Sequence, residues 1–497
     1  GGSIQGPQGV QGIQGIQGTT GTTGAAGTNG TDGADGVGGV KDFIASGTLP
    51  NGTPVILKSN GTVEAVAEIY PLADSATAYT PAKVLSTTNT DYFDVDWDPN
   101  YAGRFVLTYK PSVSPYYPQV VIGTVSGTTI TYGTPQVIVS GAHVVNTVRV
   151  KFDAGYSGSR FVITGADISA GHYNQYGYLR SYTVSGTNTI TFNHQEVFSA
   201  VGLAVSDVDI AFDPSVAGSF LVTSYTSGNR FRAGTLTNSG MTLGSVVAAS
   251  GNTSHYHRIQ FDPLTSGRAV LAMSEYGTSS MVNVCYVITV SGNTLTFGSQ
   301  HIWSTDSGTG VAVAFSTTVA GLFVASGSPG SGAGKLVAGQ ISGTSITFGT
   351  PVQYSTSTAT FPNVSLDGYE NKFIICWRNT QAKIATVSGT TITLGAGFTV
   401  AGQELYSNAV RFDRYGTRGR IVVAGTDYGG ATNGFTKILQ MTFGTPGVAN
   451  LTADNFIGTS SAAYANAATA SIVLAGGVSS NQTGLVTNST YYVQTDG

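Results

Sequence analysis

Pairs of positions with one residue between them recur in this sequence and often carry charged or polar residues. In chain order, the first four positions of this kind are Asp94/Asp96, Arg149/Lys151, Asp209/Ala211 and Arg258/Gln260. A glycoside hydrolase would need two carboxylates roughly 5–9.5 Å apart, but a cationic segment separates Asp94 from Asp209. Because the signs alternate, we expect a structural ring of ion pairs. A polar pocket at the mouth of a channel is the alternative.

Other catalytic motifs are missing from the sequence. It contains no GxSxG nucleophile elbow, no HExxH zinc motif and no P-loop. A sialidase would need an arginine cluster and the SxDxGxTW turn of that family, but only Arg149 and Arg258 share a position. His255 and His257 could face a metal ion from one strand, yet no other His or Cys completes the site, and a polar aromatic loop at the entrance of a repeat is the preferred explanation. We therefore expect no catalytic residue, no metal site and no cofactor.

Composition narrows the class of partner. Charged residues make up 10% of the 497 residues, the net charge is -4, and Lys and Arg form no cluster, which argues against a nucleic acid partner. No apolar run approaches the roughly 18 residues that a membrane helix needs. Cys285 and Cys376 lie in apolar, strand-like runs and are expected to be small buried residues.

One anchor, an alternating strand followed by an FDP-like turn and a β-branched strand, occurs seven times. Two copies read VDWDPNYAGRFVLTY and IAFDPSVAGSFLVTS, and the intervals between copies run from 46 to 60 residues. An aspartate in such a turn can bind its own backbone, and a following proline presets the turn dihedral. The turn residues are Asp98, Asp153, Asp213, Asp262, Ser316, Asp367 and Asp413.

A second anchor, SGTTITYG or a variant of it, follows each of the first six copies about thirty residues later. Each repeat therefore predicts four short strands, which is the size of a propeller blade. A parallel β-helix would repeat on a shorter period, and immunoglobulin-like sandwiches on a period near 100 residues. The predicted fold class is all-β, with a seven-bladed β-propeller over residues 62–450.

The last repeat keeps only QMTFG of the second anchor. Residues 62–73, TVEAVAEIYPLA, resemble a fourth strand that has no three strands before it. We predict that this N-terminal strand completes the last blade and closes the ring, so that no sheet edge stays open. An ordinary linker is the alternative.

Glycine occupies every third position of the N-terminal tract GPQGVQGIQGIQGTTGTTGAAGTNGTDGADGVGG. The collagen triple helix has this period because only glycine fits at the axis of three chains, whereas a flexible linker needs glycine without a period. We predict a collagen-like triple-helical stalk over residues 1–40 and therefore a homotrimer, although Pro7 is the single proline of the tract. The triplet glycines are Gly6, Gly9, Gly12, Gly15, Gly18, Gly21, Gly24, Gly27, Gly30, Gly33, Gly36 and Gly39.

Two short segments flank the predicted ring. Residues 41–61 and residues 451–497 both contain an apolar strand between glycine-containing turns. We predict two versions of one small β-hairpin module. Such modules would add the contacts between chains that a proline-poor collagen tract lacks.

The loops that lead into the seven first strands are the predicted ligand site, because equivalent loops share one face of a propeller. They carry amide, carboxylate and aromatic groups. A sugar needs such a set, since its hydroxyls require donors and acceptors and its C–H face packs on rings. We predict a cell-surface glycan as the partner, with merely solvated loops as the alternative. The residues are Asp91, His143, Asn146, Asp207, His255, Tyr256, Phe361, Asn363, Tyr406 and Asn408.

The two flanks carry a family resemblance. The Gly-x-y tract running into KDFIASGTLPNGTPVILKSNGTV, together with the tail DNFIGTSSAAYANAATASIVLAGG and TYYVQTDG, resembles collagen-like tail fibre and virion structural proteins of tailed bacteriophages, marine ones among them. The resemblance does not extend to the repeats. It implies a trimeric stalk that presents distal domains for attachment to the host surface, and it carries over no catalytic residue.

Two other functions stay open on the residues alone. A bacterial extracellular collagen-like filament or adhesin with a structural role would carry the same kind of stalk. A depolymerising enzyme would instead release reducing ends from a host polysaccharide. The expected location is the virion or the extracellular space.

Overall fold

The computed structural model forms two compact units, a ring unit (residues 72–442) and a flank unit built from residues on both sides of the ring. The described residues are 39–69, 72–78, 83–112, 117–139, 144–167, 176–199, 205, 207–226, 228–250, 254–276, 281–306, 308–329, 333–378, 381–400, 405–427, 433–444, 447–448, 450–452 and 454–474. Every regular element in these ranges is a β-strand, so the all-β class is confirmed for them. They contain no helix that could cross a membrane. The predicted collagen-like stalk lies outside the described residues, apart from its last two positions.

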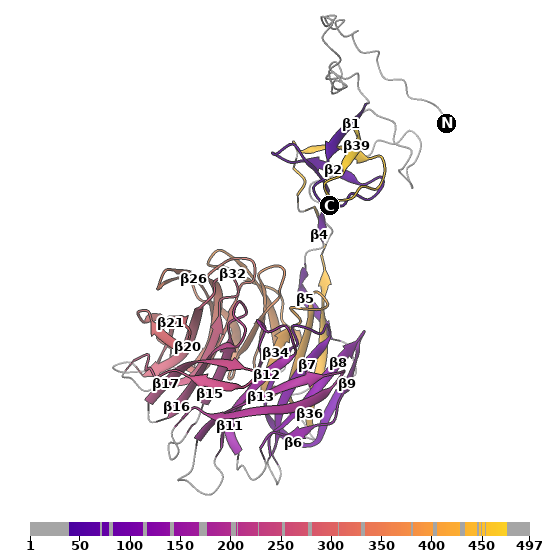
Figure 1. Ribbon diagram of the computed structural model, residues 1–497. Helices are drawn as coiled ribbons and strands as arrows, with labels where there is room; N and C mark the ends of the chain where they lie inside the picture. Colours follow the sequence, from indigo (N-terminus) through magenta and orange to yellow (C-terminus); the bar gives the residue numbers. More distant parts are fainter. Residues whose placement is uncertain are drawn as a thin grey trace, which may run out of the picture. The chain divides into compact units, whose positions relative to one another are not determined.

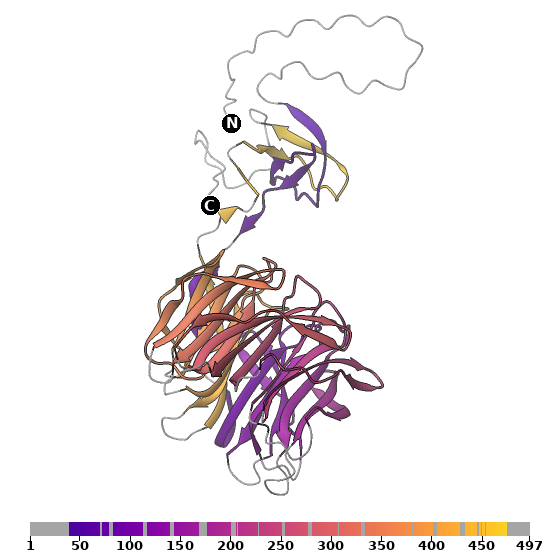
Figure 2. The ribbon, with the colours of Figure 1, turned by 90° about the vertical axis from the view of Figure 1, so that its left-hand side faces the viewer.

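Each repeat contributes an inner strand to a closed ring. The inner strands contact one another in chain order, and the last contacts the first; Figures 1 and 2 show the sheets succeeding one another along the colour scale. The inner strands are β6 (Lys83–Trp97), β11 (Val144–Phe152), β15 (Asp207–Phe212), β19 (Ser254–Phe261), β24 (Gly308–Phe315), β29 (Asn363–Leu366) and β34 (Leu405–Phe412).

Further strands extend each repeat outward from its inner strand by antiparallel pairing. The second strands are β7 (Arg104–Pro111), β12 (Arg160–Asp167), β16 (Ser219–Thr226), β20 (Arg268–Tyr276), β25 (Leu322–Pro329), β30 (Lys372–Cys376) and β35 (Arg420–Asp427). The third strands are β8 (Gln119–Ser126), β13 (Tyr176–Ser185), β17 (Gly228–Thr237), β21 (Met281–Ser291), β26 (Ala333–Ser342), β31 (Gln381–Ser388) and β36 (Asn433–Phe443). The fourth strands of the first six repeats are β9 (Thr129–Tyr132), β14 (Thr189–Val197), β18 (Gly240–Leu243), β22 (Thr294–Phe297), β27 (Ser345–Phe348) and β32 (Thr391–Leu394). Short strands that also pair with third strands are β10 (Gln136–Val137), β23 (His301–Ser304), β28 (Val352–Thr358) and β33 (Phe398–Thr399).

The hydrophobic core lies between neighbouring sheets. The middle strands are continuously apolar because both of their faces are covered; residues 269–273 of β20 are at most 1% exposed. Between the fifth and sixth repeats, Val324 and Leu336 pack in one cluster with Phe373 and Ile375. Each sheet is therefore packed against its two neighbours in the ring.

Both cysteines belong to this core, as the sequence predicted. Cys285 and Cys376 are free thiols that are fully buried. Burial raises the pKa of both thiols, so neither is a reactive group in the folded protein.

The turn residue of the anchor links one repeat to the next. Asp213 accepts a hydrogen bond from the N–H of Ser215 in its own turn (2.8 Å), as the anchor sequence predicts. Its second carboxylate oxygen accepts a bond from the N–H of Gly267 in the next repeat (2.7 Å). Asp262 contacts the repeat after it in the same way, through the N–H of Gly321 (2.9 Å). The anchor is therefore an inter-repeat contact as well as a turn.

Polar side chains of the inner strands bind the backbone of the neighbouring inner strand. An inner strand is a sheet edge, and its buried N–H groups need acceptors. Residues four and two positions before the turn residue supply them. The bonds run from Val150 N–H to Asp94 (3.0 Å), from Phe152 N–H to Asp96 (2.9 Å), from Ile259 N–H to Asp209 (2.9 Å), from Phe315 N–H to Gln260 (3.1 Å) and from Phe412 N–H to Ser365 (2.9 Å).

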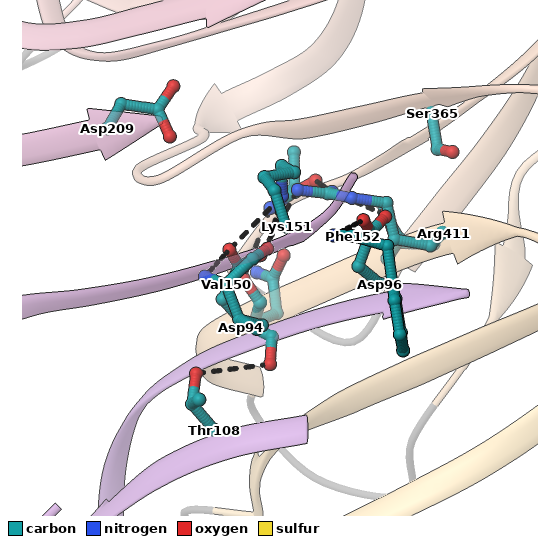
Figure 3. A network of polar contacts seen from close by, with 12 residues as sticks. Asp94, Asp96, Thr108, Val150, Lys151, Phe152, Asp209, Ser365 and Arg411 are labelled. Carbon is teal, nitrogen blue, oxygen red and sulfur yellow. Dashed lines mark hydrogen bonds and ion pairs between the residues drawn. The ribbon is translucent and has the colours of Figure 1, made fainter. Parts of the chain in front are cut away.

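Ion pairs accompany these bonds around Asp94 (Figure 3). Its carboxylate lies 3.2 Å from the Nζ of Lys151 and 3.1 Å from the guanidinium of Arg411. Burial alone would raise the pKa of Asp94, but Lys151, Arg411 and Arg149 outweigh it and lower the pKa to about 2. The predicted ring of ion pairs is therefore only partly observed in the described residues: Arg258 pairs at 3.3 Å with Asp207, which lies outside the predicted positions, and not with Asp209.

The ring is closed by an N-terminal strand, but not by the predicted one. β5 (Leu72–Ala78) pairs with β36, and the first half of β6 pairs with β36 as well before it enters the first repeat. Figure 1 shows yellow β36 between indigo and violet strands of the chain's beginning. Residues 63–65, which the sequence assigned to closure, pair in the flank unit instead. The prediction of residues 62–73 was therefore wrong in position, because alternation marks a strand and not its partner.

The two flanks form one sheet, whereas the sequence predicted two hairpin modules. The strands β1 (Val40–Ile44), β39 (Thr469–Leu474), β38 (Phe456–Ser460), β2 (Pro54–Leu57) and β3 (Val63–Ala65) pair in this order, and Figure 2 shows indigo and yellow strands interleaved. β4 (Glu68–Ile69) pairs with β37 (Gly447–Val448). The predicted boundaries at residues 61 and 451 therefore fall inside this unit, because each hairpin alone has one apolar face to cover. The side chains of Leu49, Val55, Val63 and Ile472 form its core.

Candidate ligand-binding site

A cavity of about 480 Å³ opens where the loops lead into the inner strands. We call it the loop-side cavity. Residues of all seven repeats line it, and seven of the ten residues predicted for the ligand site are among them. These seven are Asp91, Asp207, His255, Tyr256, Phe361, Asn363 and Asn408.

Three predicted site residues are not placed in this cavity. His143 lies outside the described residues, and so do the side chains of Asn146 and Tyr406. The seven predicted residues that do line the cavity come from five of the seven repeats.

Three aromatic side chains occupy the same repeat position in the cavity. Tyr92, Tyr256 and Phe361 each stand six residues before the turn residue of their repeat, and all three line the cavity. Their φ angles are 56°, 56° and 53°, a region that bulky residues rarely adopt and that costs about 1–3 kcal/mol. Tyr92 was missed at the sequence level, although its position in the repeat could have identified it.

A local irregularity of the inner strands accounts for this backbone geometry. The pairing register shifts between Asp91 and Asp94 in β6 and between His255 and Arg258 in β19. A bulge of this kind adds a residue to one strand and redirects its side chain. Tyr92 and Tyr256 each lie inside one of these shifts. The bulge therefore directs their aromatic side chains toward the cavity.

The aromatic rings on one side of the cavity contact one another. Tyr256 and Phe361 meet edge to face with centroids 6.5 Å apart. His255 lies 4.9 Å from the ring of Tyr225 and 5.8 Å from that of Tyr276. Phe361 is 40% exposed, so this wall presents apolar ring surface to whatever fills the cavity.

Asn408 is the polar residue of the cavity that has the clearest need of a ligand. Its side chain is 7% exposed, yet neither its Nδ2 nor its Oδ1 has a hydrogen-bond partner among the described residues. A buried amide without partners costs about 1–3 kcal/mol. The Nδ2 donor and the Oδ1 acceptor of Asn408 are therefore available to a ligand in this cavity.

The two carboxylates of the cavity are held by protein donors. Asp207 accepts bonds from the N–H of His257 (2.8 Å) and from Thr147 (3.4 Å), and it pairs with Arg258 at 3.3 Å. Asp91 accepts a bond from Ser112. Their positions are therefore fixed before any ligand arrives.

The histidine pair of the sequence separates in the structure. His255 lines the loop-side cavity, whereas His257 is fully buried between the hydroxyls of Thr223 (2.8 Å) and Ser254 (2.5 Å). Burial lowers the pKa of His257 to about 4, so this imidazole is neutral at pH 7. Within the described ranges, no three His, Cys, Asp or Glu residues are grouped to hold a metal.

A second cavity lies at the other end of the inner strands, near the anchor turns. It has a volume of about 360 Å³ and includes Asp96, Arg149, Arg258 and Arg414 among its lining residues. We call it the turn-side cavity. Arg149, Arg258 and Asn363 line both cavities, so the two adjoin inside the ring.

Comparison with known proteins identifies the fold. The sequence matches no protein-family model and no curated protein. The BP39L lectin from Burkholderia pseudomallei superimposes with a TM-score of 0.55 at 9% identity, over 73% of this chain and 99% of that chain. The fold is a β-propeller.

Two further solved propellers are less similar. Saccharomyces cerevisiae Sqt1 has a TM-score of 0.43 at 8% identity, over 74% of this chain and 100% of that chain. Chaetomium thermophilum Sqt1, solved with the N-terminus of ribosomal protein L10, has a TM-score of 0.44 at 9% identity, over 73% and 98%. At such identities the likeness concerns the propeller fold alone, and the ligand must be argued from the residues of this chain.

Proposed function

We propose that the propeller binds a glycan in its loop-side cavity. The observation that carries this proposal is the set of three strained aromatic residues, Tyr92, Tyr256 and Phe361, which line one cavity from the same repeat position. Strained backbone persists where the surrounding structure enforces it, and it clusters at ligand sites. A repeat position that is aromatic in three repeats and small or polar in the other four serves one asymmetric site.

The chemistry of the cavity matches that of a sugar. The C–H face of a sugar packs on aromatic rings, and its hydroxyls each need a donor and an acceptor. Asn408 supplies both and has no partner of its own among the described residues, while Asp91 and Asp207 supply fixed acceptors. The propeller fold that this chain shares with a lectin is compatible with carbohydrate binding.

We propose further that the site binds its glycan without cleaving it. Asp207 is already engaged by Arg258 and by the backbone of His257. A glycoside hydrolase would need a second carboxyl group held protonated as the acid. An assay for reducing ends released from the bound polysaccharide tests this point, and their release would make the protein a depolymerase.

The biological setting that we propose is a phage tail fibre. The twelve Gly-x-y triplets and the flanks support a homotrimeric virion protein whose stalk presents three propellers to the host surface. Three weak sites on one stalk would gain about 10²–10⁴-fold in avidity where they can bind together. A bacterial extracellular collagen-like filament or adhesin is the alternative, and immunogold labelling of virions against cells distinguishes the two.

Glycan binding should depend on the aromatic wall and on Asn408. We expect Tyr256→Ala and Asn408→Ala each to weaken binding of a monomeric glycan roughly 2- to 10-fold, as the loss of about 0.5–1.5 kcal/mol implies. The measurement is binding of the purified chain to an array of bacterial surface polysaccharides, followed by titration of the best ligand. Tyr101→Ala is the matched control, because Tyr101 is 42% exposed and is not a cavity residue. Equal binding by Tyr256→Ala, Asn408→Ala and Tyr101→Ala would reject the site.

Oligomerisation should depend on the period of the glycines. Light scattering of the intact chain should give the mass of three chains, and Gly21→Val should lower the melting temperature of the stalk because no side chain fits at the axis. Thr22→Val, one residue on, changes a position that tolerates side chains and is the control. In cell adsorption, Gly21→Val should lose avidity while its affinity for a single glycan stays unchanged. A monomeric mass for the wild type would end this part of the proposal.

A further inference from the structure

The turn-side cavity contains more cationic than anionic side chains. Its lining cations come from three repeats, and only two carboxylates, Asp96 and Asp209, accompany them in the lining. The cations are Arg149, Lys151, Arg258, Arg411 and Arg414. The proposed glycan site does not account for this group, because most of its members lie away from the loop-side cavity.

Three of the five cations already have a carboxylate. Lys151 and Arg411 both pair with Asp94, at 3.2 and 3.1 Å. Arg258 pairs with Asp207 at 3.3 Å. These three side chains therefore hold the ring together and are not free to bind a ligand strongly.

The other two cations have no such partner. Among the described residues, neither Arg149 nor Arg414 has a hydrogen bond or an ion pair, and the Nε of each is buried without an acceptor. For Arg414, one terminal nitrogen is buried and unsatisfied as well. Both side chains are partly buried, and carboxylates act on them at longer range, Asp94 and Asp209 on Arg149 and Asp367 on Arg414. Within the described part of the chain, their buried N–H groups still have no acceptor, and a buried N–H without an acceptor is destabilising. The guanidinium is also the side chain best matched to a planar or tetrahedral oxyanion, which it binds through two parallel N–H donors.

We propose that the turn-side cavity is an oxyanion site, in which Arg149 and Arg414 bind a carboxylate, sulfate or phosphate group. The site goes beyond the proposed glycan site and does not depend on it. The anion has two possible sources, a free small oxyanion or the acidic group of a saccharide, and they share this chemistry.

The carboxylates near the site add a dependence on pH. The charged groups that face the cavity and the channel behind it are Asp94 and Asp96 from β6, Arg149 and Lys151 from β11, Asp207 and Asp209 from β15, Arg258 from β19, Arg411 from β34 and Arg414 from its turn. β24 and β29 themselves contribute no charge here, but Asp367, in the turn directly after β29, acts electrostatically on Arg414. Burial raises the pKa of Asp96 and of Asp209 despite the cations around them. Acidification therefore removes negative charge from the cavity before it affects ordinary aspartates.

Titration of the full-length protein with sodium sulfate at constant ionic strength tests the site directly. We expect saturable binding by calorimetry, weakened at least about 10-fold by Arg414→Gln and by Arg149→Gln, since a hydrogen bond to a charged group contributes about 1.5–3 kcal/mol. Binding should be tighter at pH 5 than at pH 7, because sulfate stays a dianion while Asp367, which acts on Arg414 and whose pKa burial raises to about 6, loses its charge. Lys41→Gln is the control for one lost positive charge, since Lys41 belongs to β1 of the flank unit.

Further arms separate the sources and guard against misfolding. Glucuronic acid and an acidic oligosaccharide are titrated beside sulfate; an oligosaccharide that binds tighter, and only with Arg414 present, identifies the saccharide as the source. Equal binding of all three identifies a free oxyanion. Arg414→Lys keeps the positive charge but lacks the two parallel N–H donors of a guanidinium. This variant should bind sulfate with intermediate affinity, and near-UV circular dichroism checks that it folds like the wild type. Absence of sulfate and glucuronate binding, or binding that both arginine variants leave unchanged, overturns the proposal whether or not a neutral glycan binds in the loop-side cavity.

Discussion

Replacing Asp94 by alanine is expected to lower the free energy of unfolding by about 3–5 kcal/mol, because the change leaves two partly buried cations without their carboxylate. The side chain of Asp94 is fully buried and pairs with Lys151 and Arg411. It also accepts the N–H of Val150 in the second repeat. One residue of the first repeat thus holds the repeats on both sides of it, and urea unfolding of the ring measures its contribution.

The same carboxylate should contribute to unfolding in acid. Its pKa in the folded protein is about 2, against 3.8 for an ordinary aspartate. Folding therefore favours the ionised form, so the stabilisation is complete above about pH 4 and is lost as the pH falls through 2. The shift corresponds to about 2 kcal/mol. Asp94→Asn should remove this part of the acid sensitivity.

An exposed ion pair provides the control for Asp94. Asp306 pairs with Lys335 at 2.6 Å, and both side chains are 37% exposed. Pairs of this kind contribute about 0–1 kcal/mol, so Asp306→Asn should have little effect. If Asp94→Ala and Asp306→Asn lowered the free energy of unfolding equally, the ion pairs of Asp94 would not be what joins the first repeat to its neighbours.

Replacing the closing strand β5 by seven glycine and serine residues is expected to abolish cooperative unfolding of the ring. The strand pairs with β36, and Leu72 is 1% exposed in a cluster with Ile421 and Met441. Asp74 also bridges to the sixth repeat through Lys372. Loss of the strand uncovers the edge of β36, and an open edge invites pairing between molecules. Calorimetry and size-exclusion chromatography measure the outcome.

Point variants separate the contribution of packing from that of chain length. Leu72→Ala should cost about 2–5 kcal/mol through the cavity that it leaves. Ser75→Gly changes an exposed position of the same strand and should cost less than about 1 kcal/mol. A replaced strand that leaves the protein monodisperse, with an unchanged melting temperature, would show that β5 is not needed for closure.

Local patterns were sufficient to predict most of the ring. The FDP turn binds its own backbone through Asp213, and the alternation before it places Asp94 and Asp96 on the channel side and Val95 and Trp97 in the core. Both signals depend on residues close together in the chain. They recur with each repeat, which is why the number of strands per repeat could be read from the sequence.

The candidate site was predictable in part for the same reason. Loops at equivalent repeat positions must share a face of a ring. The positions of Tyr256, Phe361 and Asn408 within their repeats were therefore enough to predict that they lie in one site. Tyr92 was missed although it occupies the same repeat position as Tyr256 and Phe361; its positive φ of 56° inside a bulge is visible only in the structure. The unsatisfied amide of Asn408 and the unpaired guanidinium of Arg414 could not be predicted either, since the lack of a partner depends on every neighbour in space.

The sequence by itself determined the repeat, its four-strand content, the turn at each anchor and the apolar character of the middle strands, because all of these depend on side chains a few positions apart. The tertiary structure alone decided which N-terminal strand closes the ring and that the two flanks share one sheet. It also decided that His255 faces a cavity while His257 is buried. Strand pairing is made by backbone groups that every residue carries. The partner of a strand is therefore chosen by which apolar faces are buried together, and that choice involves residues hundreds of positions apart.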